Sequence, residues 1–420
     1  MNEIEHLDFV TEEKNEQIIK VIGVGGGGGN AVKNMYKKGI TDVSFALCNT
    51  DKAALRSSGI PVCVQLGNGL GAGNQPKKAY AAAVQSEEEI RKMLSDKTQM
   101  VFITATMGGG TGTGASPVVA KVAHELGLLT IGVVTIPFDW EMGRKQVQAM
   151  KGVVRMSHYV DALLLINNSK LIQSYPDYDL RQAFQAADDV LADAVKGIAE
   201  IITVEGYVNV DFADVCTIMR EGGVAVMNTG AATGENRVTK AFESALDSPI
   251  LNNNDICNAS RVLINVYTDN EKPIGLSEID EIKNFSKKMK VPVEEYIWGI
   301  TYVEGLGEEV KITVVATGPN MKFAPDYLKS QLEEEIAAED KKWNEEINGE
   351  NLENASNNVG ERVIIAPTPE TLEKNIQKEM YDVDVEPVKK NSITLYSLDD
   401  LDNESVMRIV RDTPSLKRYQ

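Results

Sequence analysis

The sequence predicts an α/β fold built around a parallel sheet, and three observations lead to this prediction. Short apolar runs alternate with helix-like segments over residues 17–170, glycine-rich loops follow two of these runs, and a long amphipathic helix comes next. Alternation at this spacing is typical of a parallel sheet that helices cover on both faces. Ligands of such sheets bind at the carboxyl ends of the strands.

The predicted elements follow one another in a regular order. Buried strands are expected at residues 17–25, 43–49, 61–67, 100–106, 128–138 and 160–167, with helices between them at 31–39, 76–94 and 115–127. Apolar residues then recur at three- and four-residue steps over 180–201, which predicts one long helix with an apolar face. Strand-like runs at 261–268, 296–303 and 310–317 indicate a second, smaller α/β domain that ends near residue 320.

The composition excludes several classes of protein. With 43 Lys and Arg against 62 Asp and Glu, the 420-residue chain has a formal charge of −19, so nucleic acid is not an expected partner. No apolar run approaches the roughly 20 residues of a membrane span, so no direct membrane insertion is expected. Residues 1–16, a flexible N-terminus, lack the features of an export signal, and the four cysteines form no CxxC pair. We therefore expect a cytoplasmic chain of two or three domains.

Glycine nearly disappears after residue 320, where only Gly349 and Gly360 follow, and the rest of the sequence is polar and acidic. Such a segment buries too little apolar surface to offset chain entropy. We predict an acidic disordered linker over 321–390, with a helical stretch near 325–343. The end of segment 391–420 mixes apolar and basic residues, which favours a partner-binding peptide over a solvated tail.

The first glycine loop runs from Gly23 to Asn30, after one predicted strand and at the start of a helix. Glycines let the backbone bring N–H groups against phosphate oxygens, and the helix amino terminus adds positive charge. The loop contains GxGxxG, and Asp51 follows at the spacing of a dinucleotide fingerprint, so a nicotinamide-dependent dehydrogenase is one interpretation. Five successive glycines, Gly25 to Gly29, meet no evident packing need, which favours phosphate binding.

The second glycine loop is GGGTGTG at residues 108–114, and it repeats the strand–glycine–helix order at the same edge of the sheet. A dehydrogenase needs no second loop, whereas a triphosphate presents three charged groups to surround. The hydroxyls of Thr111 and Thr113 can reach phosphate oxygens. Because GxxxxGK[ST] is absent, we expect backbone amides and helix dipoles to hold the phosphates.

At this point a resemblance to a known family is evident. GGGTGTG resembles the signature of the tubulin superfamily, and with GVGGGGGNAV (23–32), NTD (49–51), GLGAG (69–73) and NVDFADV (209–215) the chain resembles the FtsZ family of bacterial cell-division GTPases, from about residue 17 to 318. The resemblance implies a tubulin-like fold: a Rossmann-type GTP-binding domain over 17–178, a central helix over 179–204, and a C-terminal α/β domain with the catalytic loop over 205–320. It also implies GTP and GDP as ligands, with Mg²⁺ held mainly by phosphates and water.

The resemblance assigns the phosphates to three loops. The first loop contacts the α- and β-phosphates, the second is the main cradle, and the third senses whether the γ-phosphate is present. For all these glycines the alternative is turn geometry alone. The assigned residues are Gly25, Gly26, Gly27, Gly28, Gly29, Asn30, Asp51, Ala72, Gly73, Gly108, Gly109, Gly110, Thr111, Gly112 and Thr113.

At the sugar, the resemblance places Glu141 as a carboxylate that accepts hydrogen bonds from ribose hydroxyls. The family commonly has FEGxKR here, but this chain has WEMGRK. An ungapped match puts Lys145 at the position of the closing Arg, and a match on the glycine puts Arg144 beside it. The two cations differ in geometry, because Arg presents a planar fork and Lys a point charge.

At the base, the resemblance assigns Asn168 to the purine, Phe184 to stacking on it and Asp188 to guanine. A carboxylate accepts from guanine N1–H and the exocyclic amine, and adenine offers no such pair of donors. The neighbouring Asp189 lies roughly 100° further round a helix, so we favour Asp188. Phe184 also fits the apolar stripe of the helix, so a core position is its alternative.

The motif NVDFADV supplies the expected catalytic residues Asn209, Asp211 and Asp214. Two carboxylates three residues apart can hold a cation-bound water and orient it towards a γ-phosphate. Their loop follows the long helix, at the end remote from the glycine loops. The resemblance implies that one subunit's acids complete the next subunit's site, so that assembly is head to tail and hydrolysis depends on it. An N-capping role is the alternative.

The resemblance therefore implies a GTPase that polymerises with copies of itself at the mid-cell division ring. Membrane-tethering and regulatory division proteins are the partners expected for the C-terminal peptide, whose RDTPSLKRY loosely matches the family's terminal motif. A nucleotide-binding scaffold without hydrolysis is a third interpretation, and Asp211 and Asp214 argue against it. The three histidines show no metal-ligand spacing, and no residue is assigned to a metal.

Overall fold

The structure is a computed structural model, and it describes residues 17–141, 143–170, 175, 177–246, 256–286, 292–318 and 321–347, together with Ile376 and Met380. The predictions for the N-terminal segment 1–16 and the peptide 391–420 lie outside the described residues. So does most of the predicted linker after residue 347.

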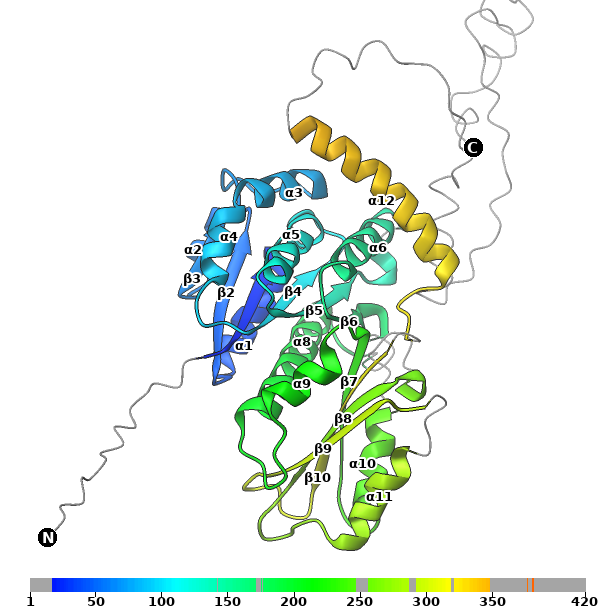
Figure 1. Ribbon diagram of the computed structural model, residues 1–420. Helices are drawn as coiled ribbons and strands as arrows, with labels where there is room; N and C mark the ends of the chain where they lie inside the picture. The colour runs from blue at the N-terminus through cyan, green and yellow to red at the C-terminus, as the bar shows by residue number, and fades with distance from the viewer. Residues whose placement is uncertain are drawn as a thin grey trace, which may run out of the picture. The chain divides into compact units, whose positions relative to one another are not determined.

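The centre of the fold is a ten-stranded sheet in the order β3-β2-β1-β4-β5-β6-β7-β10-β8-β9. Its first six strands are parallel, and in their register Val21 pairs with Phe45 on one side and with Phe102 on the other. This confirms the predicted parallel α/β fold (Figure 1). The six strands are β1 (Ile19–Val24), β2 (Val43–Asn49), β3 (Val62–Gln65), β4 (Met100–Thr106), β5 (Leu129–Ile136) and β6 (Ala162–Asn167).

Helices cover both faces of the parallel strands. Alternate strand residues enter two different apolar clusters, so that Val21 packs on the face of α1 and α8 whereas Ile22 packs on the face of α3 to α6. The helices of this part are α1 (Gly25–Lys37), α2 (Lys52–Arg56), α3 (Pro76–Gln85), α4 (Glu87–Leu94), α5 (Thr111–Glu125) and α6 (Gly143–Ser157), with a short 3-10 turn, η1 (Asp139–Glu141).

The long helix α8 (Leu180–Thr203) links the two halves of the sheet. It begins with a reciprocal cap, in which the Asp179 side chain accepts from the N–H of Gln182 and the Gln182 side chain accepts from the N–H of Asp179, both at 2.8 Å. Its apolar stripe, including Leu191 and Val195, is buried against the sheet, as the three- and four-residue spacing predicts.

The second half of the sheet is mostly antiparallel. Strand β10 lies between β7 and β8 and is antiparallel to both, β9 is parallel to β8, and β7 joins β6 through the pairs Ala162–Gly223 to Leu164–Ala225. The elements here are α9 (Phe212–Met219), β7 (Gly223–Ala232), α10 (Arg237–Leu246), η2 (Ile256–Asn258), β8 (Arg261–Thr268), α11 (Leu276–Ser286), β9 (Glu295–Tyr302) and β10 (Val310–Thr317).

Several element boundaries differ from the prediction. The first helix begins at Gly25 rather than near residue 31, so the glycine loop is itself the first turn of α1. The helix predicted over 76–94 breaks at Ser86, whose backbone leaves the helical region at φ −104° and ψ 21°. Strand β7 was not predicted, because Asn228, Thr229 and Gly230 interrupt its apolar run.

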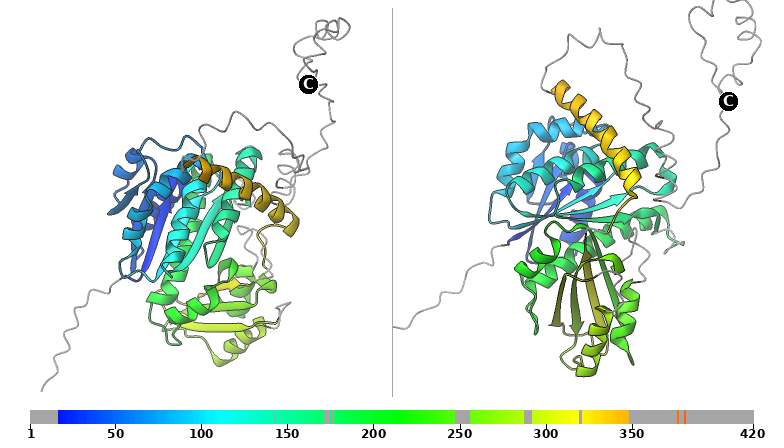
Figure 2. Two further views of the ribbon diagram at one scale, coloured as in Figure 1. Left: turned by 45° about the horizontal axis from the view of Figure 1, so that its top comes forward. Right: turned by 45° about the vertical axis from the view of Figure 1, so that its right-hand side comes forward.

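A helix is found where a helical stretch was predicted near 325–343, but the prediction that residues 321–347 belong to a disordered linker is wrong. Helix α12 (Asp326–Ile347) carries Leu328, Leu332 and Ile336 at four-residue steps, and all three are buried in the cluster that contains α5 and α6. Figures 1 and 2 show α12 lying along α6. The acidic average composition did not indicate that the apolar face of this helix packs on α5 and α6.

The acidic residues of α12 are neutralised by bases on α6. Lys151 lies 2.6 Å from Glu335 and 2.7 Å from Glu339, and Arg155 lies 2.7 Å from Glu339 and 2.9 Å from Asp340. Both bases lower the pKa of the Glu339 carboxyl, which burial alone would raise. The charge that suggested a solvated linker is therefore part of a folded contact.

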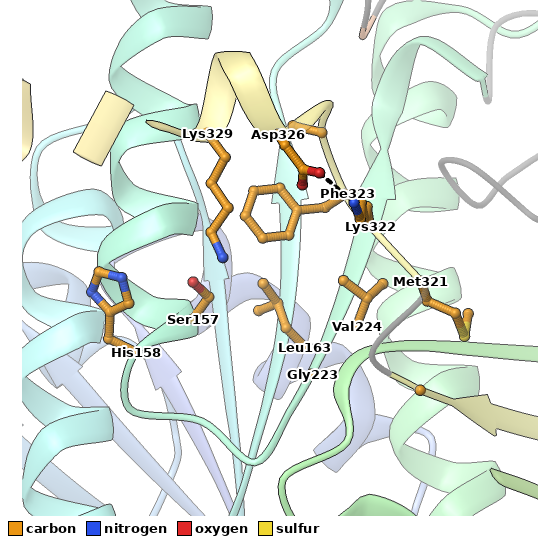
Figure 3. Close-up of a pocket in the computed structure, with 12 residues that line it drawn as sticks. Ser157, His158, Leu163, Gly223, Val224, Met321, Lys322, Phe323, Asp326 and Lys329 are labelled. Atoms are coloured by element: carbon orange, nitrogen blue, oxygen red, sulfur yellow. Dashed lines mark hydrogen bonds and ion pairs between the residues drawn. The ribbon is translucent and has the colours of Figure 1, made fainter. Parts of the chain in front are cut away.

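A cavity of about 280 Å³ lies where the chain enters α12. Figure 3 shows Phe323 and Lys329 of the entering segment converging on it with Leu163 and Val224. Leu163 and Val224 belong to the amino-terminal ends of β6 and β7. This cavity is therefore at the opposite edge of the sheet from the glycine loops.

Candidate active site

The two glycine loops meet at the carboxyl ends of β1 and β4. Gly25 has φ +78°, and a Cβ on it would lie 2.8 Å from the backbone nitrogen of Gly112, so the loops touch where only glycine fits. At the end of β2, the hydroxyls of Thr50 and Thr111 hydrogen-bond at 2.7 Å. Three neighbouring strands therefore bring their ends to one site, as expected for a parallel sheet.

Part of the first glycine run serves packing, contrary to the prediction. A Cβ on Gly27 would lie 2.1 Å from Oγ1 of Thr106, and one on Gly28 would lie 2.2 Å from the carbonyl oxygen of Thr104. These glycines let α1 approach β4 closely. Gly26 is exposed, and a Cβ there would meet nothing within 4 Å, so Gly26 borders open space at the first turn of α1.

The third predicted phosphate loop, residues 69–73, lies at the same site beside the ends of β1, β2 and β4. The N–H of Gly71 donates to the carbonyl of Thr50 at 2.8 Å, which holds the loop to the end of β2. A Cβ on Gly110 would lie 2.9 Å from the Cβ of Ala72, so the predicted γ-phosphate loop and the predicted cradle are in contact. Gly73 is exposed beside them with φ +58°.

Two of the predicted phosphate contacts have other functions in the fold. Thr113 is fully buried, and its hydroxyl accepts from the N–H of Gly108 at 2.9 Å, so it fixes the shape of the second loop from inside. Asp51 caps α2 by accepting from the N–H groups of Ala53 and Ala54. Thr111 is half-buried, and Asn30 is exposed on α1.

Glu141 lies in η1 with both carboxylate oxygens engaged. One accepts from the N–H of Phe138 at 3.1 Å, and the other lies 2.9 Å from Nζ of Lys145. Arg144, by contrast, lines a cavity of about 530 Å³ between α3, α6 and α12, together with Trp343. The two candidate cations therefore occupy different surroundings.

The predicted purine side contains a buried polar atom without a partner. Asn168, at the end of β6, is 2% exposed, and no hydrogen-bond partner among the described residues reaches its Oδ1. Burying an unsatisfied carbonyl oxygen costs free energy, so an external donor is expected there. Phe184 is 43% exposed and meets the edge of Phe138 at 5.3 Å between ring centroids, so it is not a core residue.

Asp188 and Asp189 have different surroundings on α8. Asp189 accepts from Nδ2 of Asn34 at 2.9 Å and lies 2.7 Å from Nζ of Lys38, and these contacts lower its pKa against the effect of burial. Asp188 has no hydrogen bond or ion pair to any described residue. Burial raises the pKa of Asp188 to about 7, and the charge of Asp189 adds to the rise. No sequence motif indicated that Asn34 of α1 and Lys38, just after this helix, hold Asp189.

The three predicted catalytic residues lie apart from the glycine loops and from the predicted sugar and purine contacts. Asn209, Asp211 and Asp214 are at the start of α9, beyond the end of α8, whereas Phe184 is in its first turns. The helix between Phe184 and Thr203 is about 30 Å long at 1.5 Å per residue. One chain therefore does not bring the acids to the glycine loops.

The acids also form the predicted alternative, a helix cap. Oδ1 of Asp211 accepts from the N–H of Asp214 at 2.9 Å, and Oδ2 of Asp214 accepts from the N–H of Asp211 at 3.0 Å. Asp211 is exposed and Asp214 is half-buried, and each has a second carboxylate oxygen outside this cap. Asn209 accepts from the N–H of Gly206 at 3.2 Å.

Neither a protein metal cluster nor a membrane span is found in the part of the chain that the structure describes. No group of three or more His, Cys, Asp or Glu side chains there is arranged to hold a metal ion. No helix there is long and apolar enough to cross a bilayer.

Family models match both halves of the fold. The model described as Tubulin/FtsZ family, GTPase domain matches residues 18–176, and the model described as FtsZ family, C-terminal domain matches residues 223–320. Among solved structures, an empty FtsZ dimer of M. jannaschii is 39% identical with a TM-score of 0.66, covering 72% of this chain and 88% of that one. A GTPgS-bound protofilament of CetZ2 from Haloferax volcanii, 20% identical, shares the fold with a TM-score of 0.63 over 77% of this chain and 99% of that one.

The fold and the glycine loops thus define a tubulin-like GTPase. The cell division protein FtsZ of Porphyromonas gingivalis is 44% identical over 424 residues, covering 99% of this chain and 89% of its own length, and that of Coxiella burnetii is 44% identical over 313 residues, covering 73% and 80%. The chain belongs to the FtsZ family, and residues 18–176 form its GTPase domain.

Proposed function

We propose that this protein binds GTP at the three joined loops and hydrolyses it within a head-to-tail filament of its own copies during bacterial cell division. The observation that carries the proposal is the separation of two half-sites along α8. The predicted base-binding residue Phe184 lies in the first turns of this helix and the acids follow its other end, and the helix between Phe184 and Thr203 is about 30 Å long. A subunit that stacks its α9 end on the loops of the next subunit joins the two halves and leaves both outer ends free to continue.

The phosphates are held by backbone amides at the starts of α1 and α5. Gly26 and Gly109 are the positions in these loops where a Cβ would meet no neighbour, so phosphate oxygens can approach the backbone there. The helix amino termini supply the complementary charge. Ala72, which lies against Gly110, and the neighbouring Gly73 complete the γ-phosphate side.

The base and the sugar are proposed to bind beside the carboxyl ends of β5 and β6, along the same edge of the sheet. Asn168 offers an unpartnered Oδ1, Phe184 offers an exposed ring, and Asp188 offers a carboxylate without a partner among the described residues. These three features fit a purine that stacks on an aromatic ring and donates two hydrogen bonds, which is the pattern of guanine. Glu141 is proposed to accept from the ribose hydroxyls.

Lys145 rather than Arg144 is proposed to lie beside the nucleotide. Lys145 is held 2.9 Å from Glu141, the residue proposed to bind the ribose. Arg144 faces the cavity beside α12. This favours the ungapped alignment of WEMGRK with the family motif.

Mg²⁺ is proposed to bind mainly through phosphate oxygens and water. The loops present backbone N–H groups and threonine hydroxyls rather than carboxylates, which suits an ion that keeps much of its hydration shell. When bound, the ion neutralises charge on the β- and γ-phosphates. Asp211 and Asp214 of the neighbouring subunit are then proposed to orient the attacking water, with Asn209 beside them.

Filament assembly is supported by a related structure, since M. jannaschii FtsZ is described as a dimer. We further propose that the protein acts in the cytoplasm at the mid-cell ring, and that the peptide 391–420 binds membrane-tethering and regulatory division proteins. Deleting 405–420 is expected to abolish recruitment to the septum and to leave GTPase activity and filaments intact.

Phosphate release measured against protein concentration tests the proposed mechanism. Release per subunit should be close to zero at low concentration and rise steeply above a critical concentration, because a lone subunit has half of each site. A dilute sample shown to be monomeric that hydrolyses GTP at the full rate per subunit would refute the shared site.

A further inference from the structure

Gln148 of α6 contacts the second glycine loop, and no sequence motif pointed to it. Its Nε2 donates to the carbonyl oxygen of Gly108 at 2.9 Å and to that of Gly109 at 3.0 Å. Both hydrogens of one side-chain amide are therefore engaged by two successive peptide groups of the loop.

Holding a carbonyl also orients an N–H. In a trans peptide the C=O and the N–H of the same planar unit point in opposite directions. The Gly108 carbonyl shares its peptide with the N–H of Gly109, and the Gly109 carbonyl shares its peptide with the N–H of Gly110. Because Gln148 draws both carbonyls towards α6, both N–H groups point away from α6.

The side to which these N–H groups point is the open side of the loop. No hydrogen-bond partner for either N–H is found among the described residues, and a Cβ on Gly109 would meet nothing within 4 Å. On its other flank, Gly110 is packed against Ala72 and Gln75. Glycine peptides are free to flip, so an outside contact is needed to keep two donors aligned.

We propose that Gln148 is a positioning residue for phosphate binding, which fixes the N–H groups of Gly109 and Gly110 in the orientation that a phosphate oxygen accepts. This inference rests on the proposed function, because it takes the second glycine loop as the site of phosphate binding. It adds that Gln148 of α6, a residue outside that loop, sets the orientation of the loop's N–H groups. Preorganised donors cost no reorganisation when charge arrives, which is why their alignment affects binding and transition-state stabilisation.

Gln148 is itself held in place by its helix. The preceding turn is fixed by Gln146, which is 1% exposed and donates to the carbonyl of Asp139 at 3.1 Å. The following turns carry Lys151 and Arg155, whose ion pairs attach α6 to α12. The amide of Gln148 therefore projects from a helix that is braced on both sides.

The test compares GDP with guanosine as ligands of the full-length protein. Gln148→Leu keeps the size of the side chain but removes both donors, so GDP affinity should fall about tenfold while guanosine affinity stays unchanged. Gln148→Glu places a carboxylate against the two carbonyls and should lose more GDP affinity than Gln148→Leu. Gln85→Leu, at an exposed position of α3, is the matched control and should bind both ligands normally.

The selectivity of the loss distinguishes positioning from general loosening. Unchanged GDP affinity in Gln148→Leu, or an equal loss of GDP and guanosine affinity, would overturn the positioning role. If Gln148→Leu does not fold, Gln148→Asn, which is one methylene too short to reach both carbonyls, should show the same selective loss. An unmutated protein that binds neither GTP nor GDP would overturn the proposed function itself, and the positioning role with it.

Discussion

Asp188 and Asp189 are consecutive residues of α8, yet only Asp189 is neutralised by its surroundings. Asn34 of α1 and Lys38, which follows the last residue of α1, contact Asp189 at 2.9 and 2.7 Å. Asp188 meets no such partner among the described residues, and burial together with the neighbouring charge raises its pKa from 3.8 to about 7. Asp188 therefore lacks hydrogen-bond donors from the described residues, and guanine supplies two, its N1–H and its exocyclic amine.

The first prediction is that guanosine affinity rises with pH between 5.5 and 8. The base donates to an ionised carboxylate, so below pH 7 binding must first remove the proton from Asp188. Affinity should fall by up to about tenfold per pH unit below the pKa. Guanosine is the ligand of choice because it has no phosphate that titrates in this range. Asp188→Asn should flatten the profile, and an unmutated protein with a flat profile would contradict the assignment.

The same shift predicts a stability effect in the absence of nucleotide. Between pH 3.8 and 7 the unfolded chain has lost the proton of Asp188 while the folded chain keeps it, so this group destabilises the fold increasingly as pH rises, with its full effect above pH 7. Asp188→Asn should therefore raise the melting temperature more at pH 8 than at pH 5. A larger rise at pH 5 would contradict the direction of the shift.

The second prediction separates capping from catalysis at Asp211. Asp211→Ala removes the cap of α9 and should cost about 1 kcal/mol of stability besides any loss of activity. Asp211→Asn keeps an oxygen that can accept from the N–H of Asp214, so it should fold normally, bind GTP and assemble. Its phosphate release should nevertheless be strongly reduced, because the negative charge is lost.

Mixing experiments then test where Asp211 acts. A subunit with Gly110→Ser should lose GTP binding, because the added side chain meets Ala72 and Gln75. Combined with Asp211→Asn subunits, it contributes intact acids to their intact loops, and some hydrolysis should return. No recovery in mixed filaments that demonstrably contain both subunits would argue against a site shared between neighbours.

The strands other than β7, the long helix and the loops could be predicted because their signals are local. Apolar period, glycine position and chain order define them without knowledge of any contact, and the tubulin-like fold is confirmed. What could not be predicted depends on residues far apart in the sequence. A helix was predicted near 325–343, but its docking could not be predicted, because it depends on Lys151 and Arg155, which neutralise its acidic residues. Gln148 has no signal other than its two carbonyl partners. Likewise, the need for glycine at position 27 is evident only from the structure, in which Thr106 lies against it.

The third prediction concerns the two cations after η1. Lys145→Met should lower kcat/KM for GTP about tenfold, because Glu141 loses the cation that holds its carboxylate at 2.9 Å. Arg144→Met removes a cation that faces the cavity near α12, and it should leave kcat/KM almost unchanged. The opposite ranking of the two variants would favour the alignment that places Arg144 at the nucleotide.

The fourth prediction concerns the docking of α12. Leu332 is fully buried against the GTPase domain, so Leu332→Ala should lower the free energy of unfolding by about 2–5 kcal/mol. Glu334, exposed on the same helix, is the control, and Glu334→Ala should change it by less than about 0.5 kcal/mol. Equal stability of the two variants in thermal unfolding would show that α12 is not docked in solution.

The last prediction contrasts two adjacent glycines of α1 that have opposite functions. A Cβ on Gly27 would lie 2.1 Å from Oγ1 and 2.6 Å from Cβ of Thr106, so Gly27→Ala should lower the melting temperature by separating α1 from β4. Adding Thr106→Ala should not restore it, because the Cβ of residue 106 remains. Gly26→Ala meets no atom within 4 Å and replaces a poor helix former, so it should fold at least as stably. It should nevertheless weaken GDP binding, since the new methyl group occupies the open side of the first turn. A Gly26→Ala protein with normal GDP affinity would show that the phosphates do not approach α1 there.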